Sequence, residues 1–335
     1  MRRRSQLHAL ALLGFLALVA SLPFLTDDRY LLRIATVMTV YWVLIAGLNL
    51  LVGYAGVLSI GHVGLLAIGA YTFAILAGPY GIDPFLGLLA AAGTCTAVGL
   101  VVGLPSLRLP GFYFALSTVA FGLIVVELAL AFPSVTGGTI GLAARRFPAP
   151  FDTAAGEYWL ALAVACSVTW MTWNVARLMW GRSLVAIRDS DVAARSVAIR
   201  PYKLKIVVFA FSGATAGLAG GLFARAQSYI TPEAFNFDFG LYFFIAIIIG
   251  GRGSIIGPFV GAVLLALLPD LFGSLQRYTA FFYGAVLLAV VLLQPEGFGV
   301  LFERLLGRFD HGTRGGGPIR PNPEALEAAI KAMPR

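Results

Sequence analysis

The chain has 335 residues, of which 59% are hydrophobic and only 12% are Asp, Glu, Lys or Arg, against roughly 25% charged residues in a typical soluble domain. So little charge cannot cover a water-facing surface, which excludes an ordinary aqueous globule. The mean hydropathy is +0.87, and long apolar runs recur without the alternation expected of a β-barrel. The sequence therefore predicts an all-α, polytopic transmembrane helix bundle with about 8–10 spans.

The formal charge of +8 comes from 24 Lys and Arg against 16 Asp and Glu. In a membrane protein these cations mark cytoplasmic loops, so we predict contact with the lipid bilayer and no nucleic-acid partner. Cys95 and Cys166 both fall inside apolar runs. Neither a disulfide framework nor a cysteine-ligated metal site is therefore expected.

The first apolar stretch, residues 7–25, follows three arginines and is interpreted as a retained first span with a cytoplasmic N-terminus, because a second apolar run starts almost at once. The run 241–249 is too short to span a bilayer by itself, so a broken or re-entrant segment is predicted near residues 241–271. The full set of later apolar runs is 31–52, 57–77, 85–107, 112–132, 158–180, 206–227, 241–249, 255–271 and 280–293.

Counting crossings from a cytoplasmic N-terminus places residues 181–205 in the cytoplasm. This connection carries six Lys and Arg against two Asp, as the positive-inside rule requires. Arg145 and Arg146 conflict with the count, because it places their loop outside. We divide the chain into a transmembrane domain, residues 1–300, and a cytoplasmic C-terminal tail, residues 301–335. The tail is expected to be partly disordered, with a short helix over 322–334 that either frays or docks on a partner.

The sequence lacks the motifs of ATP hydrolysis and of zinc sites. Residues 250–253 read GGRG, without the lysine and hydroxyl residue of a phosphate-binding loop. We therefore predict that the chain is not an enzyme and binds no cofactor or metal. Glu127 is the only acid well inside a predicted span, and His62 lies near the start of another. Both fit either a structural or interfacial role or a substrate path, and they are too few for an ion relay.

Two adjacent ridges of small residues are expected on one helix. Gly213, Gly217 and Gly221 recur at intervals of four, beside a second ridge that includes Gly220. Small residues let membrane helices approach closely, so we predict helix packing here; a glycine-lined substrate path is the alternative. Residues 181–199 are expected to form a short protruding helix, which either docks on a partner or lies on anionic lipid.

Six segments carry a resemblance to a known family. They are 49–71 (NLLVGYAGVLSIGHVGLLAIGAY), 109–125 (LPGFYFALSTVAFGLIV), 135–142 (VTGGTIGL), 181–199 (GRSLVAIRDSDVAARSVAI), 229–235 (YITPEAF) and 250–262 (GGRGSIIGPFVGA). Together, and in this order, they resemble the LivM-type permease subunit of branched-chain amino acid ABC importers. The resemblance runs from about residue 30 to residue 300.

The resemblance implies a pore-forming inner-membrane subunit that forms a heterodimer with a related second permease. Two cytoplasmic ATPase subunits would use the ATP, and a periplasmic substrate-binding protein would deliver hydrophobic amino acids. Residues 181–199 are similar to the loop that couples such permeases to their ATPase. We expect Arg188 to form a charge pair there and Ala193 and Ala194 to fit a groove. The full expected coupling set is Gly181, Arg182, Ala186, Ile187, Arg188, Asp189, Asp191, Ala193 and Ala194.

A substrate path is expected along Gly53, Tyr54, Gly61, His62, Glu127, Thr136, Gly137 and Gly138. Three positions depart from the family pattern: Asp191 stands where Glu is usual, Ala198 where Gly is usual and Val57 where Gln is common. Related permeases serve urea and short amides, so these remain alternative substrates. An ATP-independent facilitator or ion-coupled carrier is a further alternative, whereas the glycine-rich segment 250–257 disfavours a scaffold without transport.

Overall fold

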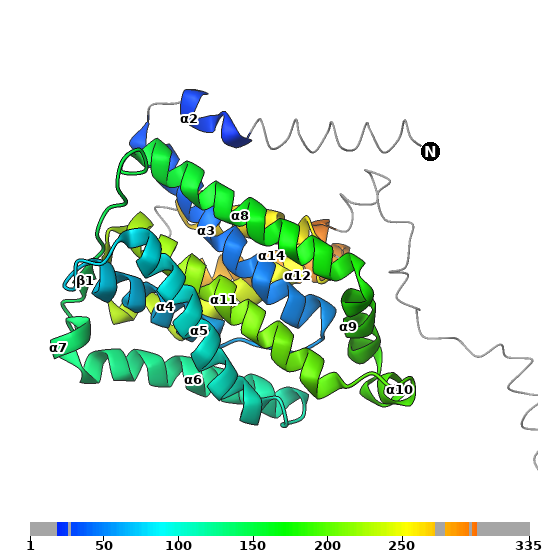
Figure 1. Ribbon diagram of the computed structural model, residues 1–335. Helices are drawn as coiled ribbons and strands as arrows, with labels where there is room; N and C mark the ends of the chain where they lie inside the picture. The colour runs from blue at the N-terminus through cyan, green and yellow to red at the C-terminus, as the bar shows by residue number, and fades with distance from the viewer. Residues whose placement is uncertain (1–18, 26–27, 272–278, 295–296, 300–335) are drawn as a thin grey trace, which may run out of the picture.

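The computed structural model describes residues 19–25, 28–271, 279–294 and 297–299 (Figure 1). Six helices in this part of the chain are long and apolar enough to cross a membrane, and three more are apolar but shorter. The all-α, polytopic prediction is therefore confirmed. The arginines at the N-terminus, most of the run 7–25 and the whole tail 301–335, with its expected helix, lie outside the described residues.

The elements follow one another along the chain with short connections. They are α2 (Leu22–Leu25), α3 (Arg29–Asn49), the π-helix η1 (Leu50–Tyr54), α4 (His62–Ala77), α5 (Pro84–Ser106), α6 (Gly111–Ala131), α7 (Pro133–Thr136), β1 (Leu142–Ala143), α8 (Ala154–Arg177), α9 (Met179–Asp189), α10 (Asp191–Ser196), α11 (Pro201–Gln227), β2 (Tyr229–Ile230), the 3₁₀ helix η2 (Pro232–Phe235), α12 (Phe237–Gly250), α13 (Gly257–Leu271) and α14 (Thr279–Leu293).

Helices α3 and α11 form the centre of the bundle. In the most apolar stretch of each span, 83% of the residues are buried in α3 with η1 and 67% in α11. The corresponding share is only 28% in each of α5, α6 and α8. All five helices are apolar, so hydropathy alone does not separate them. The exposed apolar faces of the outer helices have no counterpart in a water-soluble fold, and they suit a lipid environment.

The two small-residue ridges of α11 face two different neighbours. A Cβ atom at Gly213 would lie 2.8 Å from the carbonyl oxygen of Cys95 in α5, and one at Gly217 would lie 2.7 Å from the carbonyl carbon of Ala91. On the other ridge, a Cβ at Gly220 would lie 2.7 Å from the amide nitrogen of Ala70 in α4. Backbone meets backbone on both sides, so α11 is wedged between α4 and α5.

The apolar run 57–77 is not one continuous helix. Helix α4 begins only at His62, and the preceding residues 55–61 are irregular although most of them are buried. Gly56 has a φ of 69°, a left-handed conformation that glycine adopts without strain. Since His62 reaches Ser212 in the middle of α11, the chain folds back into the bundle before α4 starts. This break corrects the expectation of a span over 57–77.

The run 158–180 is also divided. Helix α8 ends at Arg177, Leu178 has an extended backbone with a ψ of 176°, and α9 starts at Met179. The end of the expected span therefore belongs to a separate helix. Met179 and Trp180, the last two residues of the predicted run, lie in the first turn of α9.

The region 241–271 is interrupted, as expected, but by a tight reversal of the chain. Helix α12 together with η2 gives a 19-residue apolar segment, which corrects the expectation that this part is too short to span. Residues 251–256 then turn back, with φ values of 100° at Gly251 and 80° at Gly253. A Cβ at Gly261 would lie 3.0 Å from the carbonyl carbon of Ala246. Helices α12 and α13 therefore form an antiparallel hairpin.

The bundle has two distinct ends (Figure 1). Helices α9 and α10 lie at one end, while α7 and the two-stranded β1–β2 pair lie at the other, with Leu142 opposite Ile230. Arg145 and Arg146 follow β1 and therefore lie at the end opposite α9. At the same end Nε of Arg225 donates a 2.6 Å hydrogen bond to Glu157, an ion pair that is largely buried.

Candidate functional site

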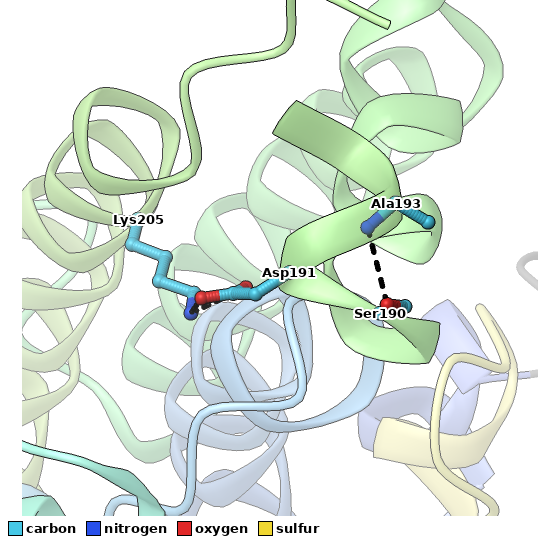
Figure 2. A network of polar contacts seen from close by, with 4 residues as sticks. All are labelled: Ser190, Asp191, Ala193 and Lys205. Atoms are coloured by element: carbon cyan, nitrogen blue, oxygen red, sulfur yellow. Dashed lines mark hydrogen bonds and ion pairs between the residues drawn. The ribbon is translucent and has the colours of Figure 1, made fainter. Parts of the chain in front are cut away.

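Helices α9 and α10 form the charged connection at one end of the bundle. The Ser190 hydroxyl caps α10 by accepting a hydrogen bond from the amide of Ala193 at 3.2 Å (Figure 2). The Asp191 carboxylate pairs with Nζ of Lys205, with N–O distances of 3.0 and 3.1 Å (Figure 2). Because Lys205 lies near the start of α11, this ion pair ties α10 to a central helix.

One face of this connection is packed against the bundle. Leu184 is 0% exposed, Ile187 is 3% exposed and Ala194 is 1% exposed, and Gly181 is buried as well. The burial of Ala194 corrects the expectation that its side chain is offered to a partner. Ala186 is half-buried. Arg182, Asp189, Val192 and Ala193 are among the exposed residues of this connection, and we call these four the outer surface of α9–α10.

Arg188 does not project freely from this outer surface. Its Nη1 donates a 2.8 Å hydrogen bond to the carbonyl oxygen of Gly53 in η1, and the exposed fraction of its side chain is 32%. Its stem crosses Gly56, where a Cβ atom would lie 2.6 Å from Cγ of Arg188. The residue expected to pair with another subunit is thus engaged within its own chain.

A buried amide, that of Asn49, directly precedes η1. Oδ1 of Asn49 accepts a 2.9 Å hydrogen bond from the amide of Gly253, and its Nδ2 donates a 2.7 Å hydrogen bond to the carbonyl oxygen of Ser254. Asn49 is 4% exposed. We did not predict Asn49 as a functional residue. The only signal for it in the sequence is an amide inside the apolar run 31–52.

The break before α4 is held by hydroxyl groups. Nδ1 of His62 lies 2.7 Å from the Ser59 hydroxyl, and its Nε2 lies 2.7 Å from the Ser212 hydroxyl. All three side chains are buried. The Thr118 hydroxyl of α6 accepts hydrogen bonds from the amides of Ile60 and Gly61 at 3.3 and 3.4 Å. His62 therefore has both ring nitrogens satisfied and pins the irregular segment to α11.

An apolar groove lies beside this break, where the start of α4 and the middle of α6 meet η2 and α12. It is lined by Ile60, Gly61, Val63, Val119, Gly122, Leu123, Phe235 and Phe237. All eight are glycine or hydrocarbon side chains. The groove supplies no charged side chain, and its volume of about 10 Å³ has room for roughly one water molecule.

The expected path residues do not converge on one site. Gly53 and Tyr54 lie in η1 beside α9, whereas Gly61 and His62 lie at the break before α4. Glu127 is exposed on the outer face of α6 and makes no hydrogen bond or ion pair within the described residues. The remaining three, Thr136, Gly137 and Gly138, lie at the far end, in and directly after α7.

Comparison with known proteins connects this arrangement to transport. The family described as branched-chain amino acid transport system / permease component matches residues 30–291. The chain belongs to this permease family. The match covers the break before α4, the outer surface of α9–α10 and the α12–α13 hairpin. No solved structure matches the chain significantly.

Individual permeases are similar over most of the chain. The high-affinity branched-chain amino acid transport system permease protein LivM of Escherichia coli K12 is 32% identical over 320 residues, covering 86% of this chain and 74% of that protein. LivM of Salmonella typhimurium is 31% identical over 315 residues, with the same two coverages of 86% and 74%. The autoinducer 2 import system permease protein LsrC of Enterobacter sp. strain 638 is 28% identical over 178 residues, covering 49% of this chain and 52% of that protein.

Membership of the permease family and the six long apolar helices make this chain a multi-pass inner-membrane protein. Its role is that of a translocation subunit rather than an enzyme. Within the described residues, no group of three His, Cys, Asp or Glu side chains is placed to hold a metal ion.

Proposed function

We propose that this permease is the translocation subunit of an ATP-driven importer of branched-chain and other hydrophobic amino acids. The observation that carries the proposal is the family match over residues 30–291, supported by the two LivM relatives.

The proposal includes the other subunits of the importer. A related second permease completes the pore, a periplasmic binding protein delivers the substrate, and two cytoplasmic ATPase subunits use the ATP. This chain itself binds no cofactor in the proposed mechanism. Both termini are assigned to the cytoplasm, on the same side as α9 and α10, since the cationic residues 181–205 follow the positive-inside rule.

The outer surface of α9–α10 is the proposed docking site for an ATPase subunit. Val192 is 80% exposed, and the same connection exposes charges of both signs, at Arg182 and Asp189. A segment that lies on anionic lipid would carry a uniformly basic polar face. The mixture of an apolar side chain with opposite charges suits a protein partner better.

Uptake in proteoliposomes tests the transport proposal. The purified complex of both permeases and the ATPase is reconstituted with ATP on the nucleotide side and a binding protein on the other. We expect uptake of leucine, isoleucine and valine that requires ATP and persists with a protonophore. Uptake of urea or acetamide in their place would refute the substrate class. Uptake that needs no ATP, or that collapses with the protonophore at constant ATP, would refute the energy source.

A matched pair of surface variants tests the docking site. Val192→Asp places a carboxylate on the outer surface of α9–α10, and Ile140→Asp does the same at the opposite end, where Ile140 is 76% exposed. Neither change affects a buried side chain. We expect Val192→Asp to reduce co-purification of the ATPase at least tenfold, and Ile140→Asp to leave it unchanged. Equal co-purification of the two variants would place the docking site elsewhere.

A further inference from the structure

Three segments that are distant in the sequence meet at one place in the bundle. They are the end of α3 with η1, the turn 251–256 and the last turn of α9. A Cβ atom at Gly53 would lie 3.1 Å from Cα of Gly253, so η1 and the turn touch through their backbones. A Cβ at Gly253 would lie 3.5 Å from Nη1 of Arg188. The guanidinium therefore lies at the contact between η1 and the turn.

Asn49 connects α3 to the turn by two hydrogen bonds. A buried amide is unfavourable unless its polar atoms are paired, and here both are paired with backbone groups of the turn, at Gly253 and Ser254. The Ser254 hydroxyl in turn accepts a 2.9 Å hydrogen bond from the amide of Gly257, the first residue of α13. The start of α13 is thus linked, through the turn, to a side chain that lies 204 residues before Gly253.

Arg188 connects α9 to the same junction. Its 2.8 Å hydrogen bond joins α9 to the carbonyl of Gly53, one helical turn after Asn49. The second tie of the α9–α10 connection, the Asp191–Lys205 ion pair, leads to α11 instead. One hydrogen-bonded route from α9 to the α12–α13 hairpin therefore passes through Arg188, η1 and Asn49.

We propose that Asn49 is a positioning residue for transport, which together with Arg188 carries a displacement of α9 to the turn 251–256. The π-helix between them suits this role, since such local widenings of a helix often occur at functional sites. Without Asn49, α9 still docks its partner, but the hairpin no longer follows it. The inference rests on the proposed function, because it takes α9 as the place where the ATPase acts.

The test compares Asn49→Ala with Thr39→Ala in the reconstituted complex. Thr39 is also buried on α3, but its hydroxyl donates only to Thr36 within the same helix. The measured quantity is substrate taken up per ATP hydrolysed, at equal amounts of bound ATPase. We expect Asn49→Ala to lower this ratio at least tenfold and Thr39→Ala to change it less than twofold. Equal ratios in the two variants would overturn the proposal.

Arg188 provides a second measurement that does not depend on a core substitution. We expect Arg188→Ala to lower uptake per ATP, and Arg188→Lys, which keeps a donor for Gly53, to restore it to within threefold of wild type. If both residues act on one route, uptake per ATP in the double variant Arg188→Ala with Asn49→Ala is no lower than in the more impaired of the two single variants.

A multiplicative loss in that double variant overturns the proposal. A normal ratio in Arg188→Ala also overturns it, and this measurement holds even if Asn49→Ala fails to fold. Failure of the proposed function is separable from these outcomes. It would appear as wild-type protein without ATP-dependent uptake, whereas failure of this inference leaves the wild type coupled.

Discussion

Replacing Gly217 by alanine adds one methyl group where α11 crosses α5. The new Cβ would lie 2.7 Å from the carbonyl carbon of Ala91 and 2.8 Å from Cα of Ala92, whereas carbon atoms in favourable contact lie about 3.5–4.0 Å apart. The two helices must therefore separate locally by roughly 1 Å. Both neighbouring atoms belong to the backbone, so no side-chain rotation relieves the contact.

Movement of α11 away from α5 is opposed on its other side. A Cβ at Gly69 in α4 would lie 2.7 Å from Cα of Gly217, so α4 already touches α11 closely at this level. Overpacking of this kind costs about 1–3 kcal/mol. The better helix propensity of alanine returns up to about 1 kcal/mol. We expect a net loss of ~1–2 kcal/mol, and failure to assemble for the larger change Gly217→Leu.

Gly93→Ala is the matched control. Gly93 lies on α5 of the same helix pair, but a Cβ there would meet no atom within 4 Å. This variant gains helix propensity without a steric cost, so it should be as stable as the wild type or slightly more stable. Thermal unfolding of the purified proteins in one detergent should then place Gly217→Ala several degrees below Gly93→Ala. A Gly217→Ala protein at least as stable as Gly93→Ala would refute the close packing of α11.

Three further changes probe polar groups. Ser212→Ala removes one partner of His62 and should lower the unfolding free energy by about 1–3 kcal/mol; unchanged thermal stability would show that this bond contributes little. Glu157→Gln breaks the buried pair with Arg225 and should cost about 3–5 kcal/mol, measured by the same unfolding assay, and a loss below 1 kcal/mol would contradict that account. Glu127→Gln changes an exposed position, so it should alter the unfolding free energy by less than ~0.5 kcal/mol and leave ATP-driven uptake intact. Uptake that becomes uncoupled from a measured proton flux in this variant would instead assign Glu127 to ion coupling.

Much of the architecture was available from local sequence. Hydropathy predicted the long helices because a membrane helix makes all its backbone hydrogen bonds within a single apolar segment. The four-residue spacing of Gly213, Gly217 and Gly221 predicted a helix surface for close contact, since the spacing places these residues on one face. The run of motifs also predicted the permease family that the comparisons show.

The break at residues 55–61 could not be located by hydropathy, because these residues are as apolar or glycine-rich as the helices around them. The gap between the runs 241–249 and 255–271 did predict an interruption, but not the tight reversal of the chain at residues 251–256. Only the tertiary structure buries Ala194 and directs Arg188 toward Gly53, 135 residues away. Asn49 is the clearest example. Its neighbours in sequence form a uniform apolar helix, and its role follows from two backbone groups more than 200 residues later, which only packing brings within reach. Local periodicity determined what spans the membrane, whereas long-range contacts decided which polar atoms meet.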